Sequence, residues 1–138
     1  MGISLSSLIN IFMQMEPEKT YFFNKKSGKV LSFSISNLST KDMEMLADIK
    51  KDKAAWLPLP KRPNSEYYKD MEEFIPTLND IKLQERLKTA LNSGRYASKS
   101  FRDQLMGKNY ETEKWNDFQR KRMKSFVISF LRQSGFNI

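Results

Sequence analysis

Three carboxylates stand close together in the segment KDMEEF: Asp70, Glu72 and Glu73. Two carboxylates that share a site can hold a metal ion through their oxygens, or divide the work of a general acid and a general base. On a helix, however, neighbours such as Glu72 and Glu73 point about 100° apart, so they do not face one substrate. We therefore interpret this segment as a solvated acidic helix face, and we expect no metal site and no cofactor.

A second set of residues favours binding over catalysis. The segments GRYASKSFRDQL and QRKRMK carry Lys and Arg side chains that could neutralise phosphates, and such contacts make binding depend on salt. The simpler interpretation is that these charges only face solvent, because the nearby aromatic residues fall on an apolar helix face and are not free to stack on bases. The candidate polyanion-binding residues are Arg95, Lys99, Arg102, Arg120, Lys121 and Lys124.

Composition excludes several classes of enzyme. The 138-residue chain has no His and no Cys, which removes the Ser-His-Asp triad, the Cys-His pair and every metal site built on imidazole or thiolate. No Gly-rich phosphate-binding loop is present either. Carboxylates, Lys and Tyr remain as catalytic groups, but the composition as a whole predicts that the protein is not an enzyme.

The net charge of +8 is unevenly distributed along the chain. Residues 1–80 contain 11 basic and 11 acidic side chains, whereas residues 81–138 contain 13 basic and 5 acidic ones. The whole excess therefore lies in the C-terminal part, an asymmetry that can indicate a surface for nucleic acid or another acidic partner. Simple Lys-rich solubility explains the same distribution, and both interpretations stay open at this point.

The first 63 residues predict a helix followed by a small antiparallel sheet. Leu5, Leu8, Ile9, Phe12 and Met13 have the spacing of an amphipathic helix over residues 4–15. The segment TYFFNKKSGKVLSFSI then predicts a β-hairpin, with Gly28 in its turn and an apolar face at Leu31, Phe33 and Ile35.

Two further elements complete this part of the chain. Ser39 and Asp42 have the spacing of a capping box, and Met43, Leu46 and Ala47 form the weak apolar stripe of a short, partly exposed helix. The next segment, AWLPLPKRP, contains too many prolines for a helix and suits a third strand at the edge of the sheet.

From residue 64 onward the sequence predicts about four helices. Pro76 ends or kinks the first, and Asp80 caps the second. The third carries Ala97, Phe101 and Leu105 on one face, and the last runs from about residue 112 to 134. We expect the aromatic residues of the last two helices to face the interior: Phe101, Trp115 and Phe118. The whole chain, residues 1–138, is predicted to be one α+β domain, a small antiparallel sheet packed against C-terminal helices.

The order of these segments resembles a bacterial family of unknown function, the uncharacterised protein family 0158. The resemblance rests on YFFNKKSGKV, WLPLP, YYKDMEEFI, GRYASKSFRDQL and WNDF, which follow one another at the family's distances over most of the chain. The sequence departs from the family at Tyr96, Ser98 and Phe130, where Gly, Phe and Trp are usual, and it is more basic than its relatives. The resemblance implies a fold type and no activity.

These observations predict a small, non-catalytic binding or regulatory protein. No apolar run approaches the roughly 20 residues that span a bilayer, and the first residues lack the positive charge of a secretory signal. We therefore expect a cytoplasmic protein that does not bind membranes, and an unknown protein is its expected partner. Binding of RNA or DNA through the basic C-terminal helices is the alternative. The oligomeric state stays open.

A sheet edge or a proline-rich segment could provide the contact with a protein partner. An exposed edge strand can accept a strand from another protein, and LPLPKRP could occupy an aromatic-lined groove. The simpler interpretation of LPLPKRP is a connector without a partner.

Overall fold

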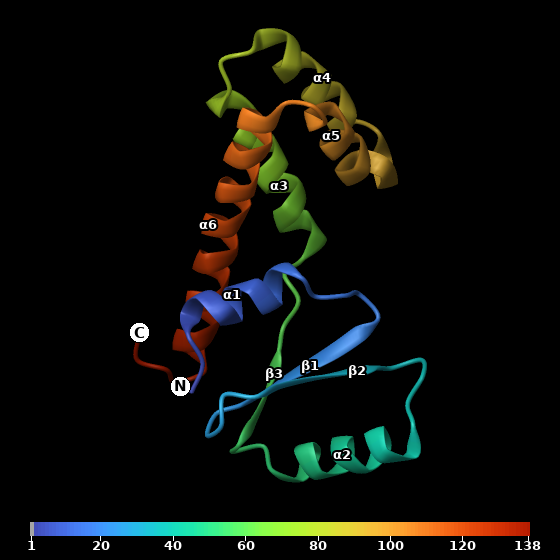
Figure 1. The fold of residues 1–138 in the computed structure, drawn as a ribbon, viewed down its shortest axis with the longest axis vertical. Coiled ribbons are helices and arrows are strands. Elements are labelled where there is room, and N and C mark those ends of the chain that lie inside the picture. Colours follow the sequence, from blue (N-terminus) through green and yellow to red (C-terminus); the bar gives the residue numbers. More distant parts are fainter. Residues whose placement is uncertain (1) are drawn as a thin grey trace. The chain divides into compact units, whose positions relative to one another are not determined.

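The computed structural model describes residues 2–138 and has the α+β class predicted from the sequence. Over these residues it contains six α-helices and one three-stranded antiparallel sheet, with a helix at the N-terminus and most helices in the C-terminal part (Figure 1). The chain divides into two compact units, Met1–Lys61 and Arg62–Ile138. A single domain over the whole chain remains a prediction.

The first unit confirms the predicted hairpin and the predicted third strand at its edge. The strand order is β2-β1-β3, and both pairings are antiparallel. Phe22 of the central strand lies opposite Leu31 on one side and Pro58 on the other. Its elements are α1 (Leu5–Met13), β1 (Lys19–Asn24), β2 (Val30–Ser34), α2 (Thr40–Lys51) and β3 (Trp56–Leu59).

The hairpin turn depends on a glycine. Gly28 has φ +76°, in the left-handed region, and an added Cβ there would lie 2.2 Å from the carbonyl oxygen of Gly2. Any other residue at position 28 therefore meets both backbone strain and a clash with the N-terminal segment.

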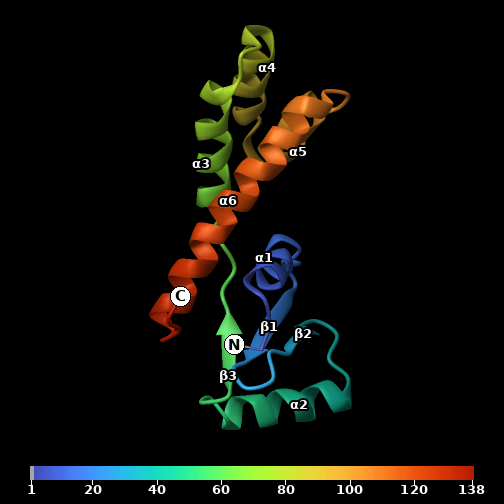
Figure 2. The same cartoon turned by 60° about the vertical axis from the view of Figure 1, so that its left-hand side comes forward.

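Figure 2 shows the sheet of the first unit between α1 and α2. Phe22 and Phe33 cluster with Ile49 of α2, and the two rings meet edge to face with centroids 6.1 Å apart. The capping box of Ser39 and Asp42 is present as predicted. The predicted stripe of α2 is right for Leu46, which faces the sheet, and wrong for Met43 and Ala47, which are exposed. Met45 and Ile49 face the sheet together with Leu46.

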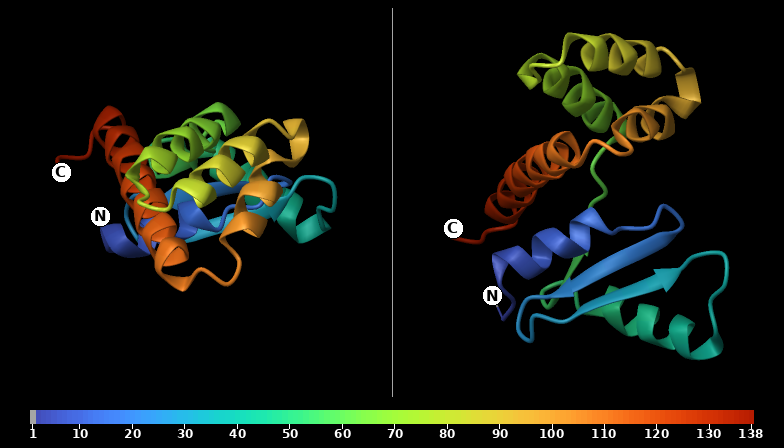
Figure 3. Two further views of the ribbon diagram at one scale, coloured as in Figure 1. Left: turned by 90° about the horizontal axis from the view of Figure 1, so that it is seen from above. Right: turned by 45° about the horizontal axis from the view of Figure 1, so that its top comes forward.

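The second unit consists of helices. As Pro76 predicts, the first helix gives way to a short 3₁₀ turn at that point, and Asp80 caps the helix that follows. Figure 3 shows α4 and α5 side by side, joined by a second 3₁₀ turn. The elements are α3 (Asn64–Phe74), η1 (Ile75–Thr77), α4 (Ile81–Leu91), η2 (Gly94–Tyr96), α5 (Ala97–Leu105) and α6 (Asn109–Gln133).

An aromatic cluster forms the core of the second unit. Trp115 of α6 lies between Phe74 of α3 and Phe101 of α5, with ring centroids 5.0 and 4.9 Å away. Phe74 and Phe101 are fully buried, and Phe118 packs against the same cluster. The prediction that Phe101, Trp115 and Phe118 face the interior is therefore confirmed.

Candidate functional site

The carboxylates of KDMEEF lie in a cluster of ion pairs and not on a solvated face. Asp70 is 1% exposed, less than any other charged residue in the described part of the chain. Glu73 is half-buried, whereas Glu72 points to solvent. The expectation of a solvated acidic face is therefore wrong for Asp70 and right for Glu72.

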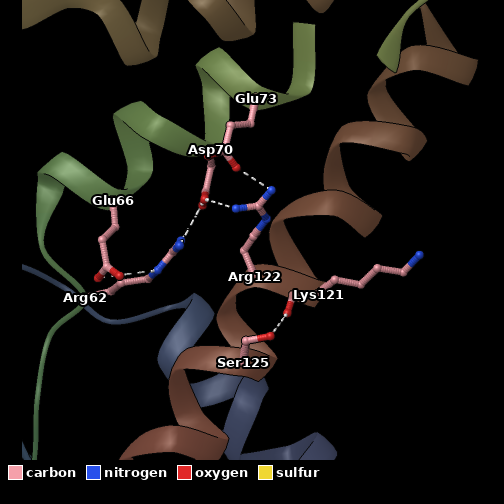
Figure 4. Close-up of polar contacts among 7 residues, drawn as sticks. All are labelled: Arg62, Glu66, Asp70, Glu73, Lys121, Arg122 and Ser125. Atoms are coloured by element: carbon pink, nitrogen blue, oxygen red, sulfur yellow. Dashed lines mark hydrogen bonds and ion pairs between the residues drawn. The ribbon is translucent and has the colours of Figure 1, made fainter. Parts of the chain in front are cut away.

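Arg62 is the main partner of Asp70 (Figure 4). Its guanidinium donates from Nη1 to Oδ2 and from Nη2 to Oδ1, the second bond measuring 3.0 Å. The Arg62 side chain is itself 6% exposed, and its Nε lies 3.8 Å from Glu66. Two parallel hydrogen bonds of this kind fix both the position and the orientation of the planar guanidinium.

A second guanidinium reaches the cluster from α6. Nη2 of Arg122 lies 2.5 Å from a carboxylate oxygen of Glu73, and Nη1 lies 4.0 Å from Asp70. The Arg122 guanidinium also covers the ring of Phe118, 4.7 Å from its centroid. We call the set the Arg62–Asp70 cluster, which consists of Arg62, Glu66, Asp70, Glu73 and Arg122.

The cluster shifts the acid–base properties of the residues around it. Burial by itself lowers the pKa of Arg62, but the hydrogen bond and the negative charge of Asp70 outweigh it, so the net shift of that pKa is upward. Burial raises the pKa of Tyr67, whose ring lies 5.2 Å from the Arg62 guanidinium. Both shifts hold these side chains in their protonated forms.

The geometry of the Arg62–Asp70 cluster favours a structural role. Asp70 and Glu73 already accept charged donors, and hydrogen-bonded ion pairs of this kind are the usual way to satisfy a buried charge. Within residues 2–138, His, Cys, Asp and Glu side chains form no group of three suited to a metal ion. The cluster joins the second half of α3 to the middle of α6.

Helical spacing is the sequence signal that could have revealed the cluster. Glu66, Asp70 and Glu73 stand at positions i, i+4 and i+7, which share one face of a helix, and Arg62 lies four residues before Glu66. Sequence reasoning grouped Asp70 with its chain neighbours instead.

The structure places the six candidate polyanion-binding residues in two separate groups. Figures 1 and 3 show α5 and α6 running away from each other from the turn that joins them. One group belongs to η2 and α5, where Lys99 lies 3.7 Å from Asp103 and Arg95 donates to the hydroxyl of Tyr96. The members of this group are Arg95, Lys99 and Arg102.

The second group, Arg120, Lys121 and Lys124, lies on α6. Arg120 is half-buried, and the two lysines are exposed. In Figure 4 the side chain of Lys121 points away from the Arg62–Asp70 cluster, opposite to Arg122. The two groups therefore lie on helices that diverge.

Three large apolar side chains are exposed at helix termini next to one ion pair of the second unit. The ion pair of Asp80 and Lys108, at 3.8 Å, joins the start of α4 to the turn between α5 and α6. Ile81 is 72% exposed, Met106 76% and Tyr110 70%, and each stands within two residues of that ion pair in the chain. We call Ile81, Met106 and Tyr110 the apolar end. Sequence periodicity did not indicate them, because each lies at a helix terminus where a stripe begins or stops.

Comparisons with known proteins give one match. A family model described as Uncharacterised protein family (UPF0158) matches residues 1–138, the whole chain. No curated protein and no solved structure matches the sequence or the fold. No helix in the described part of the chain is both long and apolar enough to cross a membrane.

Proposed function

The chain belongs to the Uncharacterised protein family (UPF0158), and we propose that it is a small, non-catalytic binding or regulatory protein that acts in the cytoplasm on a protein partner. The observation that carries the proposal is the apolar end of the second unit, Ile81, Met106 and Tyr110. Large exposed apolar side chains that gather at one place mark interaction sites.

The side chains of the apolar end suit a protein surface. Met is flexible and polarisable, so it adapts to the shape of a partner. Tyr offers a large ring together with a hydroxyl group and is enriched at interfaces. The ion pair of Asp80 and Lys108 beside them provides a polar border. A partner segment with apolar side chains fits this arrangement best.

The Arg62–Asp70 cluster supports a non-catalytic role. Asp70 is the buried carboxylate of the cluster, and two guanidinium groups already hold it. A general base must lie within hydrogen-bond distance of the substrate proton that it removes. Asp70 thus contributes to the fold of α3 and α6.

Affinity capture from nuclease-treated lysate tests the protein-binding proposal. We expect the unchanged chain to retain a defined partner, and the double variant Met106→Ser with Tyr110→Ser to lose it. Met43→Ser is the matched control, because Met43 is an exposed methionine of α2, outside the apolar end. Retention of the same proteins by all three chains would contradict the proposal.

Nucleic-acid binding is the second candidate function, and Lys121 and Lys124 support it. Both are exposed on α6, about one helical turn apart, within the part of the chain that holds all the excess positive charge. Contacts to phosphates would come from the charges alone, because Trp115 and Phe118 belong to the core and are not available to stack on bases.

Fluorescence polarisation with labelled RNA at several salt concentrations tests this second function. We expect affinity to fall steeply with salt, and Lys121→Glu with Lys124→Glu to abolish binding. The matched control is Lys50→Glu with Lys51→Glu, which makes the same charge change at exposed positions of α2. An equal loss in both double variants, or no binding at low salt, would exclude a specific role for α6.

A further inference from the structure

β2 presents one side of its backbone away from the sheet. The Asn24 N–H donates to the Lys29 carbonyl, and the Ile35 N–H donates to the Glu18 carbonyl. Hydrogen-bonded pairs alternate along an antiparallel ladder, so Leu31 and Phe33 bond to β1 between these two pairs. The backbone groups of the residues between them, Val30, Ser32 and Ser34, therefore point outward.

One of the outward groups of β2 already has a partner within the chain. The carbonyl of Ser34 accepts from Asn37. Among residues 2–138, no backbone hydrogen bond reaches the outward groups of Val30 and Ser32. Figures 1 and 2 show no strand beyond β2 on that side of the first unit.

The two edges of the sheet differ in how they resist pairing. Natural edge strands are protected by proline, charge, a bulge or a cover. β3 contains Pro58, which has no N–H to donate, and Pro60 follows it. β2 has the sequence VLSFS, without proline or charge, and its pairing with β1 has no bulge. The β2 edge is therefore the one suited to accept a strand.

We propose that the β2 edge binds the β2 edge of a second copy of this chain in an antiparallel arrangement about a two-fold axis at Ser32. The outward groups lie symmetrically about that residue, because Val30 and Ser34 stand two positions to either side of it. Ser32 would exchange both backbone bonds with its copy, and Val30 would face Ser34 of the other chain. Each outward N–H would thus meet a carbonyl of the other strand, and the Ser34 carbonyl would accept a second hydrogen bond beside that of Asn37.

The side chains of β2 support the same arrangement. Leu31 and Phe33 lie on the face that α2 covers, and across the two-fold axis each would face the other, so the apolar layer would continue from one chain into the next. Ile35, 64% exposed at the end of β2, would lie beside the aliphatic part of Lys29 of the second copy. The arrangement places no like charges opposite each other.

A single introduced cysteine tests the geometry in the full chain. The two Ser32 residues would form a hydrogen-bonded antiparallel pair, whose Cα atoms lie about 5.5 Å apart, within the range that a disulfide spans. The chain has no cysteine of its own. Under mild oxidation we expect Ser32→Cys to form a covalent dimer, whereas Ser36→Cys, exposed and just beyond the strand, should stay largely uncrosslinked.

Charge variants test the dimer without a covalent bond. Ser32→Lys and Ser32→Glu each place like charges opposite each other, so each should dimerise more weakly, by up to about fivefold, in sedimentation experiments. An equimolar mixture of the two should form a heterodimer as stable as the unchanged dimer or more so. A chain that is monomeric at every concentration, equal crosslinking at positions 32 and 36, or a mixture that fails to associate would overturn the proposal.

Discussion

The guanidinium of Arg62 donates hydrogen bonds to both carboxylate oxygens of Asp70, and both side chains are almost fully buried. Arg62 stands just before α3 and Asp70 in its middle, so the pair holds the first residue of the second unit against α3. Buried ion pairs cost desolvation energy, and loss of one partner leaves the other charge without compensation.

Asp70→Ala should therefore lower the free energy of unfolding by about 3–5 kcal/mol. Urea denaturation followed by circular dichroism measures the effect. Glu72→Ala is the matched control, because Glu72 is an exposed carboxylate of the same helix, and it should change stability by about 0.5 kcal/mol or less. Similar losses in the two variants would show that the ion pair does not stabilise the second unit.

The double variant Arg62→Met with Asp70→Leu separates two effects on stability. One is the net contribution of the ion pair, and the other is the cost of leaving one buried charge without its partner. Replacing both charges by apolar side chains removes the desolvation cost together with the attraction, and the result is often neutral or stabilising. We expect this double variant to be more stable than Asp70→Ala by about 2 kcal/mol or more. Equal stability of the two variants in the same urea experiment would contradict that account.

Trp115 should be the most sensitive position of the aromatic cluster. Its ring contacts those of Phe74, Phe101 and Phe118, so removing it leaves a cavity among three aromatic side chains. We expect Trp115→Ala to cost about 3–5 kcal/mol in the urea experiment. Tyr110→Ala, an exposed aromatic position on the same helix, should leave the urea midpoint almost unchanged.

Helices, their caps and the hairpin could be predicted because local sequence patterns determine them. Alternation at Leu31 and Phe33 predicted the hairpin, and Asp80 predicted the start of α4. The spacing of Ala97, Phe101 and Leu105 predicted the buried face of α5. The same reasoning did not predict the exposure of Ile35. Its N–H still donates to the Glu18 carbonyl, but the residue lies one position beyond β2 and is 64% exposed.

The Arg62–Asp70 cluster could not be predicted in the same way. Arg122 stands in QRKRMK among cations that resemble it, and only the helix geometry turns it toward Glu73 while Lys121 points away (Figure 4). Charged side chains are normally solvated, so a buried pair is not the default interpretation of any Asp or Arg. Its detection requires knowing that α3 and α6 are neighbours, which local sequence does not contain.

Asp80 should make stability depend on pH in a defined direction. The N–H of Leu83 donates to its carboxylate at 3.0 Å and lowers the pKa of Asp80 below the ordinary 3.8, and the charge of Lys108 adds to this effect. A carboxyl group with a lowered pKa in the folded state contributes stability that is fully present above the ordinary pKa. That contribution is lost as the pH falls through the lowered value.

Asp80→Ala should therefore lower Tm at pH 7, and the difference from the unchanged chain should shrink as the pH falls below 3.8. Thermal unfolding followed by circular dichroism at pH 7, 5, 3 and 2 measures it. Asp117→Ala, at an exposed position of α6, provides the control for the loss of one negative charge. A Tm difference for Asp80→Ala that stays constant down to pH 2 would mean that the ionised carboxylate does not stabilise the start of α4.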